Sequence, residues 1–362
     1  MSHEKRDDAD PASAFEAVRA TTSREKLKME MPMQTIRLGT TGPSMSRFGI
    51  GAMSFSGAYG SATEEQCHAV LDLCREAGVT HIDTANLYGK GRSEQIIGAW
   101  LADREGARDE MVIATKAGNT GDPERRFNND PDYLERCLDD SLTRLGVDHV
   151  DLFYVHRYDA THAIEDVAGT LSRLIESGKT RAVGLSEVAP STVRRATTIC
   201  PIAAVQSEYS LATRAPELGL VQTCRDIGAA LVAFSPVGRS FLTSAPFTPS
   251  QAATFNFTKA NPRFTEPNYS ANIAITDRFR ALADEMGEPA AALAIAWVMS
   301  RGDHILPIPG TRRPEHLREL IRGTEINLTE SDLARIETVL PVGWAHGDRY
   351  SYAQWLGPER YS

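Results

Sequence analysis

Residues 150–187 read VDLFYVHRYDATHAIEDVAGTLSRLIESGKTRAVGLSE, and this stretch contains two short apolar runs separated by a helical pattern. The runs at 150–156 and 182–187 have the composition expected of strands that are buried on both faces. Residues 164–177 show the apolar spacing of a helix, and Gly178 stands where that helix should end. The stretch therefore predicts a strand, a helix and a second, parallel strand.

The same alternation of strand and helix recurs along the chain. Further strands are expected at 46–53, 81–85, 111–116, 203–209, 230–236 and 305–309. Helices are expected at 63–77, where Thr63 and Gln66 suggest a capping box, and at 132–145, where leucines recur at helical spacing. Eight strands alternating with helices favour an α/β fold of the (β/α)8 TIM-barrel type in a single domain, with a doubly wound sheet as the alternative.

Two segments depart from this alternation. Residues 239–272 contain four prolines and no clear pattern, which predicts a long irregular loop after the seventh strand, at the catalytic end of the barrel. Residues 1–32 are highly charged and predict a disordered leader, so the barrel domain is expected to span 33–362.

Composition narrows the function classes. The 362 residues are 41% hydrophobic and 24% charged, which is typical of a globular protein, and the net charge of −9 disfavours nucleic acid as a partner. The five cysteines form no C-x-x-C pair, so neither a structural zinc site nor a disulfide framework is expected. The longest apolar run, 290–299, is too short to span a membrane, and no signal peptide is visible. We therefore expect a cytoplasmic protein that acts on a small molecule and binds neither a metal nor a membrane. The sequence does not determine the oligomeric state and is compatible with a homo-oligomer.

Polar residues stand where consecutive strands end, which is where active sites of such barrels are assembled. Asp83 and Tyr88 follow the second strand, Lys116 ends the third, and His156 ends the fourth. A lysine ammonium near a tyrosine hydroxyl favours the phenolate, an aspartate can hold the lysine, and a histidine can orient a carbonyl group. These four residues suit protonation of a carbonyl oxygen while another group delivers hydride.

The hydride donor is not held by a Rossmann fingerprint, because the glycine pair at 49–51 lacks the third glycine and a suitable acidic residue. Barrels can instead bind phosphate groups near strands seven and eight. Residues 234–239 and 308–315 lie there, and Arg312 and Arg313 at a helix start suit a phosphate monoester.

The chain resembles the aldo-keto reductases, and more closely their bacterial and plant members, from about Met33 to the C-terminus. The motifs that carry this resemblance are DTANLYG (83–89), ATK (114–116), VHR (155–157), GLSE (184–187), VQSEYS (205–210), FSPVGR (234–239) and IPGTRR (308–313).

The resemblance implies NADPH/NADP+-dependent interconversion of carbonyl compounds and alcohols. Tyr88 would be the general acid, Lys116 and Asp83 would tune it, and His156 would orient the substrate. Phe55 and Tyr59 would line the substrate pocket together with Tyr88 and His156.

The resemblance also implies the cofactor contacts. Ser186 and Gln206 would hold the carboxamide, and Phe234 would stack on the nicotinamide ring where many members have tyrosine. The pyrophosphate would meet Ser235, Gly238 and Arg239, the 2′-phosphate would meet Arg312, Arg313 and His316, and the adenine would meet Glu319. Met53, Asp83, Pro236, Gly310 and Thr311 complete the expected set.

Two positions depart from the family pattern. Glu187 stands where many members have Asn, and a carboxylate accepts hydrogen bonds but donates none, so it could hold only the NH₂ of the carboxamide. Leu320 stands where many relatives have an Asn near the adenine, so one polar contact is expected to be missing.

Two other classes of function compete with a carbonyl reductase. One is a cofactor-sensing subunit that binds a partner protein, because potassium-channel β subunits resemble the same family. The other is a metal-dependent hydrolase on the same barrel, but the His-x-His pair or clustered carboxylates that it needs at strand ends are missing from the sequence.

Overall fold

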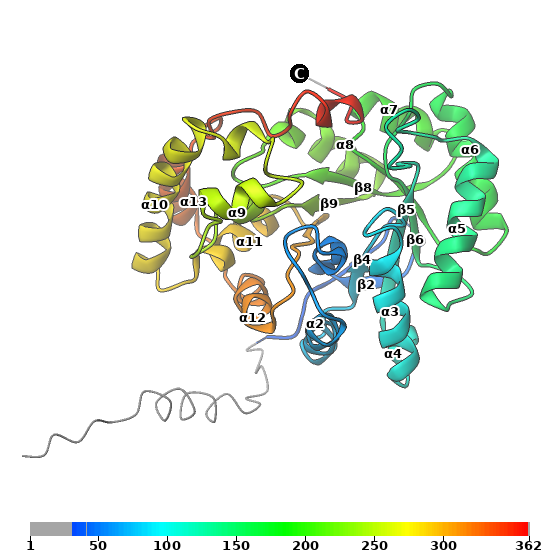
Figure 1. The fold of residues 1–362 in the computed structure, drawn as a ribbon, viewed down its shortest axis with the longest axis horizontal. Helices are drawn as coiled ribbons and strands as arrows, with labels where there is room; N and C mark the ends of the chain where they lie inside the picture. The colour runs from blue at the N-terminus through cyan, green and yellow to red at the C-terminus, as the bar shows by residue number, and fades with distance from the viewer. Residues whose placement is uncertain (1–30, 41, 361–362) are drawn as a thin grey trace, which may run out of the picture.

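A computed structural model describes residues 31–40 and 42–360, so most of the predicted leader lies outside the described residues. Eight parallel strands form one sheet, and each lies within, or within one residue of, a predicted strand (Figure 1). They are β3 (Gly49–Gly51), β4 (His81–Asp83), β5 (Val112–Ala117), β6 (Leu152–Val155), β7 (Val183–Ser186), β8 (Ile202–Glu208), β9 (Ala230–Phe234) and β10 (Ile305–Pro307).

The sheet is ordered β10-β9-β8-β7-β6-β5-β4-β3, so neighbours in the chain are neighbours in space. Its two outer strands meet where the Gly51 N–H donates to the carbonyl of Pro309 over 2.9 Å. A Cβ on Gly51 would stand 2.8 Å from the Ile308 carbonyl oxygen, so the close approach of the two segments requires glycine. The predicted (β/α)8 barrel is confirmed, and the doubly wound alternative is wrong.

Helices surround the sheet, as Figure 1 shows. They are α2 (Glu64–Glu76), α3 (Arg92–Asp103), α4 (Ala107–Glu110), α5 (Pro131–Leu145), α6 (Ile164–Glu176), α7 (Pro190–Thr197), α8 (Leu220–Ile227), α9 (Pro249–Thr254), α10 (Asn268–Glu285), α11 (Ala290–Ser300), α12 (Pro314–Arg322) and α13 (Glu330–Val339). The three predicted helices match α2, α5 and α6 to within one residue at each end. The capping box of Thr63 and Gln66 is present, which explains the agreement at the start of α2.

The buried apolar residues form two main clusters that follow from the alternation of side chains along the strands. The larger one joins the helices to the outside of the sheet. The smaller one fills the barrel with side chains such as Tyr154 and Val232. An antiparallel hairpin, β1 (Thr35–Arg37) and β2 (Ser44–Ser46), contributes Leu38 and Met45 to that interior cluster. The hairpin therefore closes the end of the barrel opposite the predicted site.

The prediction of an irregular loop at 239–272 is wrong in part. The segment contains α9, a 3-10 turn at Pro262–Phe264 and the start of α10. Pro249 and Pro262 each stand at the first position of their helical turn, where the missing N–H of proline has no cost. These prolines begin helical turns instead of preventing them.

No helix within the described residues combines the length and apolar composition that crossing a membrane requires.

Candidate active site

The carboxyl ends of β4, β5 and β6 bring Asp83, Lys116 and His156 to one end of the barrel. Beyond β4 the chain keeps pairing with β5, because Thr84 N–H donates to Ala114 O and Asn86 N–H donates to Lys116 O. A turn then bonds Tyr88 N–H to Ala85 O before α3 begins. This extended pairing returns the Tyr88 side chain to Lys116, so the structure brings together all four predicted catalytic residues.

Lys116 is the centre of this group. Its ammonium Nζ lies 2.5 Å from Asp83 Oδ1, 2.7 Å from the Thr84 carbonyl oxygen and 3.5 Å from the Tyr88 hydroxyl. The lysine and aspartate side chains are 0% and 2% exposed, so water does not screen their attraction. Gln206 Nε2 donates to the second oxygen of Asp83 over 2.8 Å, which satisfies both carboxylate oxygens.

Burial acts to lower the pKa of Lys116, but the charge of Asp83 and the proximity of Tyr88 raise it, and the net shift is upward. Lys116 is therefore a permanent cation at neutral pH, and it donates to the phenol oxygen. A fixed ammonium in that position stabilises negative charge on Tyr88 as its proton leaves.

His156 lies edge-on to the Tyr88 ring, with ring centroids 5.8 Å apart. Burial lowers its pKa well below the usual value, and the charges of Arg157 and Lys116 lower it further. The imidazole is therefore neutral at pH 7, and it has one N–H to donate. Its Nδ1 is buried with no hydrogen-bond partner among the described residues.

Arg312 and Arg313 lie between β10 and α12, at the start of that helix. No carboxylate within the described residues pairs with either guanidinium group, whereas Arg239, Arg263 and Arg349 each pair with one. The N-cap position of α12 is Arg313 itself, and it makes no capping bond from its side chain. Two guanidinium groups without a carboxylate partner among the described residues, at a helix start without a side-chain cap, fit a phosphate group, as NADPH would present.

The loop that follows β3 makes hydrogen bonds with the segment that contains Arg312 and Arg313. Ser54 Oγ donates to the Thr311 carbonyl over 2.9 Å, and Arg312 Nη1 donates to the Tyr59 carbonyl. Burial raises the pKa of Tyr59. The ring of this predicted substrate residue contacts Phe247 and Phe255.

The remaining predicted site residues lie in several environments. Phe55 is fully buried in the larger apolar cluster, and Leu320 is 4% exposed. Met53, Phe234, Ser235 and Glu319 are half-buried, Pro236 and Thr311 are buried, and Gly310 and His316 are exposed. Ser186 Oγ accepts a hydrogen bond from Arg157 Nη1 over 3.1 Å. The backbone after β9 is left-handed at Ser235, Gly238, Arg239 and Ser240, with φ of 52°, 59°, 54° and 90°.

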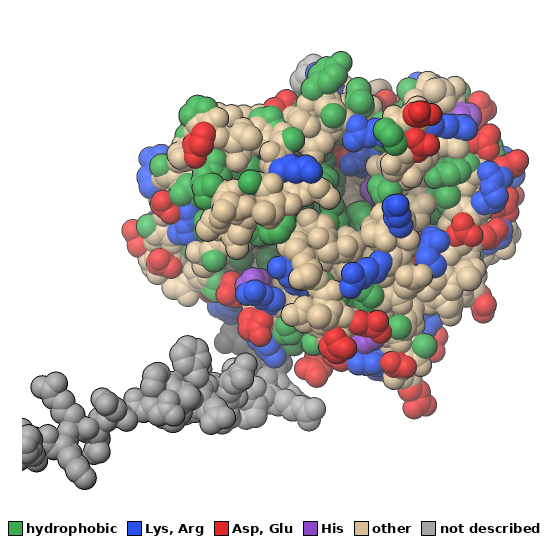
Figure 2. Space-filling model, viewed as in Figure 1, with side chains coloured by type: hydrophobic (Ala, Val, Ile, Leu, Met, Phe, Trp, Pro, Cys, Tyr) green, Lys and Arg blue, Asp and Glu red, His purple; other side chains and the backbone are tan. Residues whose placement is uncertain are grey.

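Sequence reasoning missed a buried ionic network at the barrel mouth. Arg239, predicted to meet pyrophosphate, pairs with Glu208 over 2.5 Å. Glu187 pairs over 2.5 Å with Arg349, a residue that no motif singled out. Glu187 Oε1 also accepts from Ser207 Oγ and Glu208 N–H, so both carboxylate oxygens are occupied. Glu187, where many family members have Asn, was the one residue in the sequence that could have indicated this network, because a buried carboxylate needs a cationic partner. Figure 2 shows Lys and Arg side chains around a recess on this face.

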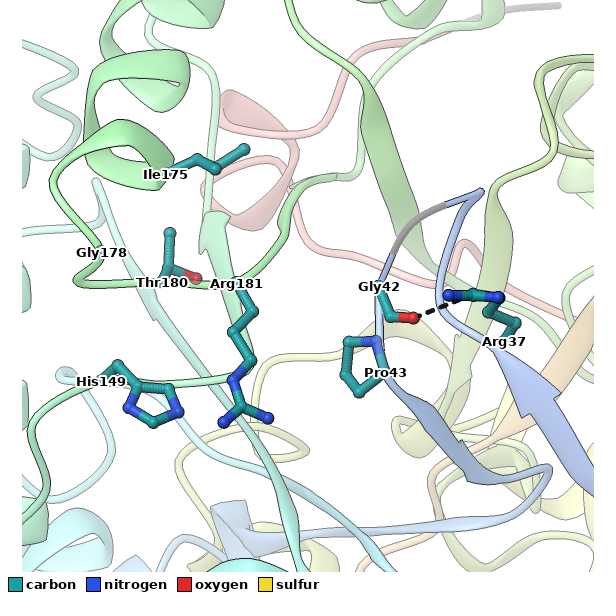
Figure 3. A pocket seen from close by; sticks show the side chains of 8 residues that line it. All are labelled: Arg37, Gly42, Pro43, His149, Ile175, Gly178, Thr180 and Arg181. Carbon is teal, nitrogen blue, oxygen red and sulfur yellow. Dashed lines mark hydrogen bonds between the residues drawn. The ribbon is translucent and has the colours of Figure 1, made fainter.

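A second feature lies at the opposite end of the barrel. A pocket of about 620 Å³ separates the β1–β2 hairpin from the segments that precede β6 and β7 (Figure 3). None of the predicted site residues lines it; its lining is Arg37, Gly42, Pro43, His149, Ile175, Gly178, Thr180 and Arg181. Within the described part of the chain, no group of three or more His, Cys, Asp or Glu residues is arranged to hold a metal ion.

The barrel and the four residues at its strand ends define an α/β-barrel protein of the aldo-keto reductase type. A family model for the aldo/keto reductase family matches residues 47–341, and the chain belongs to that family. It is 36% identical over 326 residues to "Aldo-keto reductase yakc [NADP(+)]" of Schizosaccharomyces pombe, covering 88% of this chain and 95% of that protein. It is 38% identical over 321 residues to "Probable aldo-keto reductase 1" of Glycine max, covering 88% and 92%.

Among solved structures, the glycerol dehydrogenase AKR11B4 of Gluconobacter oxydans superposes with a TM-score of 0.75 at 25% identity. That match covers 89% of this chain and 99% of the other.

Proposed function

We propose that this protein is an NADPH-dependent carbonyl reductase that converts aldehydes or ketones to alcohols, with Tyr88 as the general acid. The observation that carries the proposal is the contact of the Lys116 ammonium with both Asp83 and the Tyr88 hydroxyl. Tyr88 donates its proton to the carbonyl oxygen, and Lys116 stabilises the phenolate that remains. Family membership and the NADP(+) in the name of the yeast relative support this assignment.

NADPH supplies the hydride when it is bound. Arg312 and Arg313 bind its 2′-phosphate, because they stand together at the start of α12 and no carboxylate within the described residues pairs with either of them. Neutral His156 donates a hydrogen bond to the substrate carbonyl and orients it toward Tyr88. Tyr59, stacked on Phe247, forms part of an apolar wall that selects apolar or aromatic carbonyl compounds.

The test is a panel of aldehydes and ketones, with loss of NADPH absorbance as the readout for the wild type and Tyr88→Phe. We expect turnover by the wild type and a loss of kcat of about 100-fold to 10,000-fold in the variant, the range of general acid catalysis. NADPH affinity should be retained, and Tyr133→Phe on α5 serves as the matched control.

Two results would contradict the proposal. Substantial carbonyl reduction by Tyr88→Phe would remove the assignment of the general acid. Tight NADPH binding by the wild type without consumption across the panel would favour the cofactor-sensing subunit instead.

A further inference from the structure

The C-terminal segment 344–359, hereafter the C-terminal strap, is fixed at both ends of its course across the barrel mouth. Trp344 Nε1 donates to the Leu211 carbonyl over 2.8 Å. At the other end the Glu359 carboxylate accepts from the Ala189 N–H, and the Glu359 N–H donates to the Glu187 carbonyl over 2.9 Å. Figure 1 shows the segment, in red, running from beside α10 and α13 to α7.

The middle of the C-terminal strap is held by charge. Arg349 Nη2 lies 2.5 Å from Glu187 Oε2, and Nη1 lies 3.5 Å from Glu208 Oε2. All three side chains are less than a tenth exposed, so the ion pairs are screened little by water. The guanidinium of Arg349 also lies over the rings of Tyr350 and Trp355.

The same network reaches residues next to the catalytic group. Arg239 Nη1 donates to the Arg349 carbonyl over 3.0 Å, so the strap helps to place Arg239. Further along, a Cβ on Gly357 would stand 3.0 Å from Arg157 Cδ, so the strap lies against Arg157. Arg157 in turn donates to the His156 carbonyl over 2.6 Å. The strap is therefore in contact with Arg157, the residue that follows His156.

We propose that Glu187 and Arg349 are positioning residues that hold the C-terminal strap as a wall of the active site, and that this wall determines how tightly substrates bind. Glu187 thereby binds the strap and not the nicotinamide carboxamide. The inference rests on the proposed carbonyl reductase. Its physical basis is that both oxygens of the Glu187 carboxylate accept hydrogen bonds from the protein, Oε1 from Ser207 and the Glu208 N–H and Oε2 from Arg349.

Loss of Arg349 leaves the buried Glu187 carboxylate without its paired cation, and loss of Glu187 leaves Arg349 with only the longer pair to Glu208. Both changes favour release of the strap. Release of the strap would open the proposed wall of the substrate site but would leave Tyr88, Lys116 and Asp83 in place, since these are held by β4 and β5. The expected signature is a rise in KM with little change in kcat, together with exposure of the strap to protease.

The experiment compares Arg349→Met, Glu187→Gln, the double variant and Arg349→Lys by chymotrypsin cleavage and by steady-state kinetics. In Arg349→Met we expect cleavage within 344–359, mapped by mass spectrometry, to become about 100-fold faster. KM for the carbonyl substrate should rise about tenfold while kcat stays within about threefold. Arg349→Lys, which retains the charge, should restore most of the protection, and the double variant should be less affected than the sum of the single variants.

Arg195→Gln is the matched control, because Arg195 and Glu165 form an exposed pair at 2.7 Å whose loss should change neither readout. Unchanged cleavage in both Arg349→Met and Glu187→Gln would overturn the proposal, as would faster cleavage with an unchanged KM. Protection of the strap from chymotrypsin can be measured whether or not the protein reduces carbonyl compounds. If Arg349→Met and Glu187→Gln release the strap while the wild type reduces no carbonyl compound, the proposed function is contradicted. The role of Glu187 and Arg349 in holding the strap then stands.

Discussion

Asp83→Asn removes one charge from the buried pair at the centre of the site. The two charged atoms are 2.5 Å apart. At an effective dielectric constant of about 20, unit charges at this distance attract by about 7 kcal/mol, most of which offsets the loss of hydration on burial. Breaking a buried pair by removal of one partner typically costs about 3–5 kcal/mol. We therefore expect the free energy of unfolding of Asp83→Asn to fall by about that amount.

The double variant Asp83→Asn/Lys116→Met tests whether this cost comes from an uncompensated charge. Lys116→Met alone leaves Asp83 buried with Gln206 as its remaining side-chain donor, so it should also be destabilised by about 3–5 kcal/mol. The double variant contains neither charge and should lose less than the sum of the two, with a coupling of about 2 kcal/mol or more. Both single variants and the double variant should lose carbonyl reduction.

Urea unfolding should be followed by tryptophan fluorescence and by far-ultraviolet circular dichroism, because coincident transitions are needed before free energies are compared. The exposed pair Arg195–Glu165 supplies the control cycle, with Arg195→Gln and Glu165→Gln, and its coupling should stay below about 1 kcal/mol. The reasoning is refuted if the effects of Asp83→Asn and Lys116→Met add to within about 0.5 kcal/mol.

Two further predictions concern the cofactor and pH. Replacement of Arg312 and Arg313 by Ala should weaken NADPH binding about 100-fold or more, since charge-assisted bonds to phosphate are lost, and should leave NADH binding nearly unchanged. Fluorescence titration with both cofactors measures this, and equal losses would remove the 2′-phosphate assignment. The pKa of His156 is lowered in the folded state, so unfolded protein binds more protons below about pH 6.5 and stability falls as the pH decreases. His156→Gln should lose less stability than wild type between about pH 7 and pH 5, and identical slopes in urea unfolding would contradict this.

The strands, three helices and the clustering of Asp83, Tyr88, Lys116 and His156 were predictable because their signals are local. A capping box, a leucine repeat or a polar residue at a strand end lies within a few positions of what it determines. The C-terminal strap was not predictable in this way. Arg349 and Glu187 are 162 positions apart, and nothing near Arg349 in the sequence indicates a partner. The helices within 239–272 were missed for a different reason. The prolines of this segment were interpreted as excluding helices, but proline is compatible with the first turn of a helix and disrupts only later turns.

Charge compensation distinguishes Arg239 and Arg349 from Arg312 and Arg313. Arg239 and Arg349 are buried and paired with Glu208 and Glu187, so their charge is satisfied by the protein itself. Arg312 and Arg313 are held at the start of α12 with no carboxylate within the described residues to balance them. Burial lowers the pKa of Arg312, and the charge of Arg313 lowers it further, so an anion placed between them would relieve a repulsion that the free protein retains. An uncompensated pair of this kind gains most from a ligand that carries the missing charge, and this is the physical reason to assign the 2′-phosphate to the end of β10 and not to the segment after β9.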